Sequence, residues 1–349
     1  MSPMPPRISV VIPAYNRVEP LKYTLRSVAR AAERLNEPVE ILLVDDGSNP
    51  PIEAQLQGFD AGISVSHVRQ ANSGSIVARL RGLEAATGDC VLFLDSDDLI
   101  HPDKLLKQLA AMAEERADIS YADMAEASLG PEYGIERFAP AEVLPKVDQP
   151  AKFFIDVQPA PHNPIFRRSY LRQLVATPIV PAMRPMDPSG DVWLYYNLAP
   201  YPAKIVKVNA PLSAPGPHGE DRYSRHWERL GVSALLIMEQ FMRRCPQTDQ
   251  NVAARAAVGA AAFRSWRNLP RDFDGGFTRR MLAIYHRAPK GSLDDLGTPN
   301  FSRLARLLGP VAAGRLLRAF RAKPYRSSRT LSAEDYERLL SDLNKHDGL

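Results

Sequence analysis

Two aspartates stand two residues apart at the end of a short apolar run: Asp95 and Asp97, with Asp98 next in the chain. Side chains two apart on an extended segment point the same way, so both carboxylates can face one spot. Crowded carboxylates repel one another unless a cation sits among them. Mg²⁺ or Mn²⁺ prefers a few carboxylates plus phosphate oxygens from a substrate. We therefore expect a divalent metal here that clamps a diphosphate. The alternative is a turn in which Asp98 caps the following helix.

A second pair of carboxylates, Asp45 and Asp46, follows another apolar run and precedes Gly47 and Ser48. The same residues suit an ordinary tight turn, because Asp and Gly favour turns and Ser or Asp can cap a helix. The functional interpretation is that one carboxylate accepts hydrogen bonds from a base or a ribose. The residues alone leave both interpretations open.

The elements that must position these carboxylates alternate between strands and helices. We expect strands at 8–12, 39–44, 63–68 and 91–94, and helices at 19–35, 75–87 and 101–116. Apolar strands separated by helices indicate a Rossmann-like, mostly parallel sheet with helices on both faces. Ligands bind beyond the carboxyl ends of such strands. Three polar clusters stand there, at residues 15–17, 45–46 and 95–98.

The later part of the chain has a different composition. Prolines are dense between residues 124 and 220, so long helices are not expected there. We expect helices at 230–245, 251–268 and 277–287. Between Phe301 and Arg329 there are eight Lys or Arg and no Asp or Glu. This region is either a helical domain with a cationic outer face or a surface that touches anionic lipid.

Composition limits the function classes. The chain has 349 residues, 45% of them hydrophobic and 24% charged, so we expect a globular protein of two domains or of one domain with a large appendage. Its net charge of +4, without aromatics interleaved among the basic residues, does not indicate a nucleic-acid partner. Cys90 and Cys245 cannot form a disulfide framework. Without a secretory signal or an apolar run of roughly 18 residues, we expect a cytoplasmic protein, or one held peripherally at the inner face of the membrane.

Four ordered segments resemble the family 2 glycosyltransferases. They are residues 10–17 (VVIPAYNR), 41–48 (ILLVDDGS), 72–74 (NSG) with Ala78 and Arg79, and 93–98 (FLDSDD). The resemblance is strong over residues 7–125 and weak over 160–220. It implies the A-type glycosyltransferase (GT-A) fold, a nucleotide-sugar donor, a Mn²⁺ or Mg²⁺ cofactor and inversion at the anomeric carbon.

The resemblance also implies residue roles around the donor. Pro13 and Tyr15 would line the nucleotide pocket, and Asp46 would meet the base, usually uracil in this family. Arg79 would lie near the donor phosphates or brace Asp95. Asp95 would contact the ribose and the water shell of the metal. Asp97 would be the direct metal ligand, and His218 would reach the metal or the pyrophosphate, although a loop histidine can also be merely exposed.

The family places its catalytic base in a Glu-Asp pair followed by an apolar helix. Residues 190–199 match that motif, with Asp191 on the Asp and Gly190 where the family has Glu. One carboxylate suffices to take a proton from an acceptor hydroxyl, so we expect Asp191 to be the base. The alternative is that Asp191 caps the helix, and Asp187 is the nearest rival base. His162 belongs to a segment that resembles the border of the family's acceptor site.

These inferences define the expected organisation. Residues 1–222 would form the catalytic domain, with a nucleotide-binding half at 1–123 and an acceptor-side half at 124–222, and residues 223–349 a helical C-terminal region. The expected activity is transfer of a sugar from a nucleotide-diphosphate donor, with a UDP-sugar as the expected donor. The acceptor would be a hydroxyl of a glycan, lipid-linked or small-molecule acceptor in cell-surface or secreted glycan synthesis. The alternative is a non-catalytic nucleotide-sugar or carbohydrate-binding protein on the same fold. A phosphohydrolase with Asp-x-Asp on its first strand is disfavoured, since this motif follows about the fourth strand.

Overall fold

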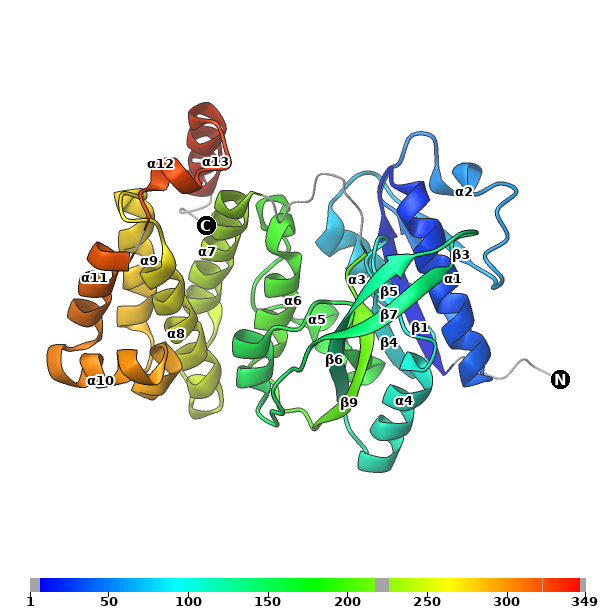
Figure 1. Cartoon of the computed structure of the whole chain (residues 1–349), viewed down its shortest axis with the longest axis horizontal. Coiled ribbons are helices and arrows are strands. Elements are labelled where there is room, and N and C mark those ends of the chain that lie inside the picture. Colours follow the sequence, from blue (N-terminus) through cyan, green and yellow to red (C-terminus); the bar gives the residue numbers. More distant parts are fainter. Residues whose placement is uncertain (1–6, 217–225, 322, 346–349) are drawn as a thin grey trace. The chain divides into compact units, whose positions relative to one another are not determined.

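The computed structural model describes residues 7–216, 226–321 and 323–345. These residues form two compact units. The first consists of residues 7–153, 157–178 and 201–216, and the second of residues 154–156, 179–200 and the described residues from 226 onward. Figure 1 shows the strands of the first unit and, in yellow-green to red, the later helices of the second. The domain boundary at residue 222 stays a prediction.

The first unit is built on one sheet, which has nine strands among the described residues. They are β1 (Ile8–Ala14), β2 (Val39–Asp45), β3 (Ser66–Arg69), β4 (Cys90–Phe93), β5 (Leu99–Ile100), β6 (Ile119–Leu129), β7 (Ile135–Glu142), β8 (Ile165–Arg167) and β9 (Ile205–Ala214). The order is β3-β2-β1-β4-β8-β6-β9-β5, with β7 paired to β6. β3, β2, β1 and β4 are mutually parallel, and the β4–β8, β6–β8, β6–β7 and β5–β9 pairs are antiparallel.

Helices cover both faces of the parallel strands. The helices of this unit are α1 (Val18–Leu35), α2 (Ile52–Gln55), α3 (Ser75–Ala85), α4 (Lys104–Glu115) and α5 (Arg168–Ala176). α1 and α4 bury Leu25 and Leu109 in one core with Val10 and Leu92 of the sheet. α3 lies on the opposite face, where Gly82 approaches Val11 so closely that an added Cβ would be 2.2 Å from Cγ1. The predicted α/β class with helices on both faces of the parallel strands is confirmed, and the sheet as a whole is mixed.

The second unit is helical, as predicted for the C-terminal region. Its elements are the 3₁₀ turns η2 (Arg184–Ser189), η4 (Asp249–Asn251) and η5 (Leu293–Leu296) and the helices α6 (Gly190–Leu198), α7 (Trp227–Arg244), α8 (Val252–Asn268), α9 (Gly275–Arg287), α10 (Pro299–Leu308), α11 (Pro310–Arg321), α12 (Tyr325–Ser328) and α13 (Ala333–Lys345). The π-helix η1 (Lys152–Val157) has residues in both units. Among the described residues, none of the helices is both long and apolar enough to cross a bilayer.

Candidate active site

Three loops meet at the carboxyl edge of the parallel sheet. β1 lies between β2 and β4, and all three run in the same direction, so the residues that follow them share one edge. Hydrogen bonds join the first two loops: Asn16 N donates to Ser48 Oγ at 2.9 Å, and Asn49 N donates to Asn16 Oδ1 at 2.9 Å. The third loop joins the first through an ion pair of 3.1 Å between Arg17 Nη1 and Asp97 Oδ2. The structure therefore brings together the three polar clusters predicted to converge.

Each carboxylate of the Asp95–Asp97 pair has an arginine partner. Arg79, buried on α3, places Nη2 2.5 Å from Asp95 Oδ1, while Arg17 holds Asp97. The guanidinium groups offset the repulsion between the carboxylates. Side-chain exposure is 33% for Asp95 and 14% for Asp97, so a ligand arriving from solvent can still reach both. Of the two roles predicted for Arg79, the contact to Asp95 is present.

Asp98 is buried and takes part in a different set of contacts. Its Oδ2 is hydrogen-bonded to Nδ1 of His162, and its Oδ1 accepts from Gly216 N at 3.2 Å. The N-cap position of α4 is held by Asp103. The alternative in which Asp98 caps this helix is therefore wrong: its carboxylate is used to tie the Asp95–Asp98 turn to the segments that contain His162 and Gly216.

Asp45 and Asp46 accept hydrogen bonds from main-chain amides of the neighbouring loops. Asp45 accepts from Ser48 N at 2.8 Å and Ile52 N at 3.1 Å, as a turn residue does. Asp46 Oδ1 accepts from Ser73 N at 2.8 Å, and Asp46 Oδ2 accepts from Gly74 N at 2.9 Å.

Gln70 Nε2 also donates to Asp46 Oδ1, at 2.8 Å. A carboxylate has about four lone-pair positions, so the three bonds to Asp46 leave about one for a ligand. Both carboxylates thus have a structural role, and only Asp46 keeps the further role of a base contact as a proposal. Tyr15 is 47% exposed and Pro13 half-buried, which leaves Tyr15 open to a ligand.

The predicted divalent ion can be tested against the donor set. Within residues 7–216, 226–321 and 323–345, no three His, Cys, Asp or Glu side chains form a ligand group for a metal. Asp95 and Asp97 nevertheless supply hard oxygen donors, and Mg²⁺ or Mn²⁺ commonly takes one or two carboxylates and completes its shell with water and substrate phosphates. The two residues fit an ion held jointly with a diphosphate. His218, the third predicted ligand, lies outside the described residues.

The predicted base belongs to the second unit, whereas the carboxylates of the sheet edge belong to the first. Asp191 is in the first turn of α6, and the N-cap position predicted for it as the alternative is held by Ser189, which makes no side-chain cap bond. Its Oδ1 accepts from Val192 N at 2.9 Å. Asp187, the rival base, lies in η2, and its Oδ2 is 3.5 Å from Arg184 Nη1. The role of Asp191 as the base stays a proposal.

Sequence reasoning missed a buried polar network beneath this site. Lys104 Nζ, fully buried, donates to Gln108 Oε1 and to the main-chain oxygen of Asn163 at 2.6 Å. Burial lowers the pKa of Lys104 well below its ordinary value. Asn163 pairs its side-chain amide with both main-chain groups of Ala122. The network fixes the chain at His162, the partner of Asp98. A lysine on the apolar face of a predicted helix was the signal that could have shown it.

Comparison with known proteins shows what this part of the chain is. The family model described as "Glycosyl transferase family 2" matches residues 9–175. The chain carries a family 2 glycosyltransferase domain. The match contains all three polar clusters of the sheet edge, and it confirms the resemblance of the four sequence segments.

Curated relatives match about a third of the chain. An undecaprenyl-phosphate 4-deoxy-4-formamido-L-arabinose transferase of Pseudomonas savastanoi is 37% identical over 123 residues, 34% of this chain and 36% of that protein. Its namesake in Proteus mirabilis is 36% identical over 117 residues, 32% of this chain and 35% of that protein. The matched region spans from 16% to 46% of the length of such relatives. Similarity to them therefore concerns only part of each protein.

Solved structures extend the likeness of fold to nearly the whole chain. Staphylococcus aureus TarS 1–349 in complex with UDP-GlcNAc has a TM-score of 0.56 at 17% identity and covers 93% of each chain. The mannosyltransferase PcManGT from Pyrobaculum calidifontis, in complex with GDP-Man and Mn²⁺, has a TM-score of 0.53 at 16% identity. It covers 99% of this chain and 90% of that one. At these identities the comparison establishes the fold alone.

Proposed function

We propose that this protein is an inverting, metal-dependent glycosyltransferase that transfers a sugar from a UDP-sugar to an acceptor hydroxyl. The observation that carries the proposal is the meeting of Asp46, Asp95 and Asp97 at the carboxyl edge of the parallel strands within a family 2 domain. Ligands of such sheets bind at that edge.

The proposed donor site uses the residues of the three loops. The exposed ring of Tyr15 and the half-buried Pro13 would line the nucleotide pocket, with the remaining acceptor position of Asp46 directed to the base. Asp95 would contact the ribose while Arg79 holds its carboxylate in place. TarS binds UDP-GlcNAc and PcManGT binds GDP-Man, which supports a nucleotide-sugar donor without fixing the base.

The proposed metal site consists of Asp97 and the neighbouring Asp95, with His218 as a further ligand. A divalent ion bound there would neutralise charge on the departing diphosphate. PcManGT was solved with Mn²⁺, which supports this cofactor. Asp97 would exchange its contact with Arg17 for the ion, which would free the guanidinium to approach the phosphates.

The proposed base is Asp191. A carboxylate that accepts the proton of the acceptor hydroxyl promotes attack on the anomeric carbon, with inversion. The acceptor would be a glycan, lipid-linked or small-molecule hydroxyl. Two relatives named for undecaprenyl-phosphate substrates support a lipid-linked one. Cytoplasmic action near the membrane, in the synthesis of cell-surface or secreted glycans, follows from that acceptor class, and a membrane contact through the basic C-terminal region stays a prediction.

Calorimetry of UDP binding tests the donor and metal assignments together. We expect UDP to bind in Mn²⁺ and to bind far more weakly in EDTA. Asp97→Asn should weaken binding in Mn²⁺ by about tenfold or more, because a metal ligand is lost. Asp89→Asn is the matched control, since Asp89 is exposed and lies just before β4, whereas Asp97 follows that strand. Parent-like UDP binding by Asp97→Asn would remove the metal assignment.

A second candidate is a protein on the same fold that binds nucleotide sugars without transferring them. Gly190, which stands where the family has Glu, favours it. Release of UDP from UDP-sugars in the presence of Mn²⁺, with or without acceptor, separates the candidates. Binding without any turnover across a panel of acceptors supports the second.

A further inference from the structure

The helices α10 and α11 of the second unit each pack one side against α8 (Figure 1). The ring of Phe301 in α10 lies 5.8 Å from the ring of Phe263 in α8. In α11, a Cβ added to Gly314 would lie only 2.5 Å from Cζ3 of Trp266, so this side of α11 lies directly on α8. These contacts define the inner side of each helix.

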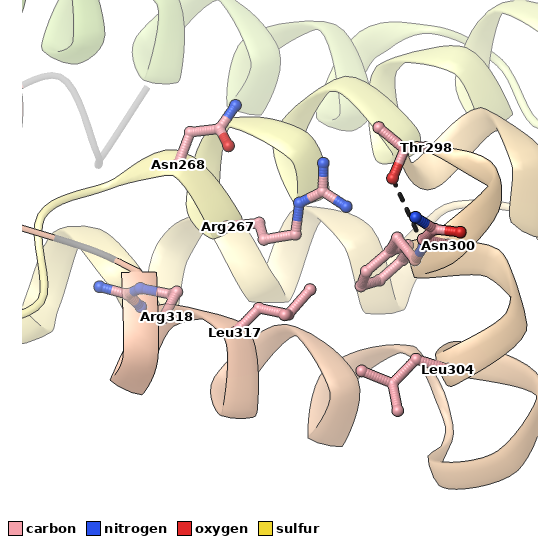
Figure 2. Close-up of a pocket in the computed structure, with 8 residues that line it drawn as sticks. Arg267, Asn268, Thr298, Asn300, Leu304, Leu317 and Arg318 are labelled. Carbon is pink, nitrogen blue, oxygen red and sulfur yellow. Dashed lines mark hydrogen bonds between the residues drawn. The ribbon is translucent and has the colours of Figure 1, made fainter.

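The other side of α11 is exposed and mostly apolar. Figure 2 shows Leu317 on the inner side, towards Arg267 of α8. The exposed residues of α11 follow the spacing i, i+3, i+4, i+7 and i+8 of one helix face, and they are Ala312, Arg315, Leu316, Ala319 and Phe320. A surface helix of a globular protein normally carries polar residues on the side that faces solvent. α11 instead presents apolar side chains to solvent as well as to α8.

The end of α10 adds two further exposed leucines. The exposed fraction is 83% for Leu307 and 50% for Leu308, against 81% for Phe320 of α11. Nine large hydrophobic residues are exposed in the described part of the chain, and four of them lie between residues 307 and 320. Scattered exposed hydrophobic residues are ordinary, whereas a concentration of them marks an interaction surface.

The charge of the same helices is positive. Arg303 and Arg315 are exposed, as is Arg306, whose guanidinium lies 3.8 Å from the exposed carboxylate of Asp294. The segment 301–329 contains eight Lys or Arg and no Asp or Glu. The exposed sides of α10 and α11 therefore combine large apolar side chains with an excess of cations.

This combination selects among the possible partners. A second copy of the chain, placed face to face on this surface, would bring arginines against arginines, and such like-charge contacts are unfavourable. An anionic bilayer offers negatively charged phosphates at its surface and acyl chains just beneath them. It is therefore complementary both to the arginines and to the apolar side chains.

We propose that the exposed sides of α10 and α11 bind an anionic lipid bilayer, with their leucines and Phe320 inserted just below the headgroups. Arg303 and Arg315 would lie at the level of the lipid phosphates. The contact would be peripheral, since none of the described helices can cross a bilayer. This inference goes beyond the proposed function, because a bilayer can bind this surface whether or not the protein transfers a sugar.

Sedimentation of the full chain with vesicles tests the proposal. We expect binding to vesicles of phosphatidylglycerol and phosphatidylcholine, and little binding to phosphatidylcholine alone. The double substitution Leu307→Ser, Phe320→Ser should lower the partition coefficient by about tenfold or more, because two apolar side chains no longer enter the bilayer. Val143→Ser is the matched control, since Val143 is 78% exposed in the first unit, and it should change binding by less than twofold.

The arginines are tested one at a time. Arg303→Gln and Arg315→Gln should each lower binding to the anionic vesicles by about fivefold, the effect of one cation near an anionic surface. Arg172→Gln, at an exposed residue of α5, should change it by less than twofold. Added salt should weaken binding of the parent, because it screens the charges.

Three results would overturn the proposal. They are the absence of binding to the anionic vesicles, parent-like binding by the Leu307→Ser, Phe320→Ser variant, and conversion of an oligomer into a monomer by that variant without lipid, which would assign the surface to a second copy. Calorimetry of UDP binding by the same variant keeps the test apart from the donor site. UDP affinity should stay within twofold of the parent, because neither residue belongs to the proposed donor site.

Discussion

At the scale of single residues, the same carboxylates that suit a metal are paired with arginines. Arg17 and Arg79 contact Asp97 and Asp95, so a divalent ion must compete with a guanidinium that is already in place. Arg17 is the more exposed arginine, with a side-chain exposure of 29% against 10% for Arg79. The competition is therefore easiest to relieve at Arg17.

Arg17→Gln should bind Mn²⁺ more tightly than the parent when no nucleotide is present. A partly exposed ion pair contributes up to about 1 kcal/mol, so its removal should tighten Mn²⁺ binding by up to roughly fivefold. Electron paramagnetic resonance of free Mn²⁺ measures this without any turnover. Arg34→Gln removes a similar ion pair at the surface, with Asp103 at 3.1 Å, and should leave Mn²⁺ affinity unchanged. Weaker Mn²⁺ binding by Arg17→Gln would show that Arg17 supports the ion.

Asp46 carries a second residue-scale prediction, because it both braces the Gln70–Gly74 segment and is the proposed base contact. Asp46→Asn should lower stability by roughly 1–3 kcal/mol, since main-chain donors lose a charged acceptor. It should also reduce the preference for UDP over CDP, because uracil offers a ring N–H where cytosine has an acceptor.

The ratio of UDP to CDP affinity, measured by calorimetry beside urea unfolding, decides between the two roles of Asp46. Asp45→Asn is the control, since Asp45 accepts from Ser48 N and Ile52 N and pairs with Arg69, and should lower stability without changing the ratio. An unchanged ratio in Asp46→Asn would leave Asp46 as a brace alone.

At the scale of elements, the sequence predicts the parallel strands and their helices well because both patterns are local. α1 and β2 lie within one residue of their predicted ranges. The end of β1 was not predicted: the strand continues through Pro13 to Ala14. Asp46 N donates to Ala14 O on the β2 side, so the missing N–H of Pro13 falls on the β4 side. The pairing of β1 with β4 ends at Val11 and Phe93, so Pro13 lies beyond the paired residues on that side.

The pairing of distant segments could not be predicted from the sequence. The contacts of Asp98 with His162 and Gly216 depend on the antiparallel return of β8 and β9 to the sheet. Short strands such as β8 carry no periodic signal of their own. The predicted strand at 63–68 is observed as β3 at Ser66–Arg69, because its position is set by the register with β2.

The placement of α3 gives an element-scale prediction. Gly82→Ala should destabilise the first unit by about 1–3 kcal/mol, because the added Cβ would overlap Val11 and push α3, with Arg79, off the sheet. UDP binding should weaken with it. Gly231→Ala, in α7 with Phe277 at 3.6 Å from the added Cβ, should instead be neutral or stabilising by up to about 1 kcal/mol. Urea unfolding measures the change in the free energy of unfolding for both variants. Equal changes would show that helix propensity, and not the contact with Val11, determines the effect of Gly82→Ala.

At the scale of the whole molecule, the family match and the likeness of fold cover different parts of the chain. Residues 9–175 match the family, whereas the likeness of fold covers nearly all of the chain at low identity. The proposed donor residues belong to the first unit, and Asp191 and the exposed sides of α10 and α11 belong to the second. A test of the proposed catalysis therefore needs both units, whereas the described residues proposed to contact UDP all belong to the first.

Substitution of Asp191 can separate sugar transfer from donor binding. Asp191→Asn keeps the shape of the side chain and loses its basicity, so it should bind UDP-sugar within about twofold of the parent and transfer sugar 10²–10⁴-fold more slowly. Asp187→Asn should be much milder, because the family motif falls on Asp191 and Asp187 has Arg184 beside it. Single-turnover transfer, with UDP affinity measured in parallel, distinguishes the two steps. If Asp187→Asn is the inactive variant, the alignment through Gly190 is misplaced. If both variants transfer normally, neither carboxylate takes the acceptor proton. If the parent binds donor but transfers to no acceptor, the binding-protein alternative gains support.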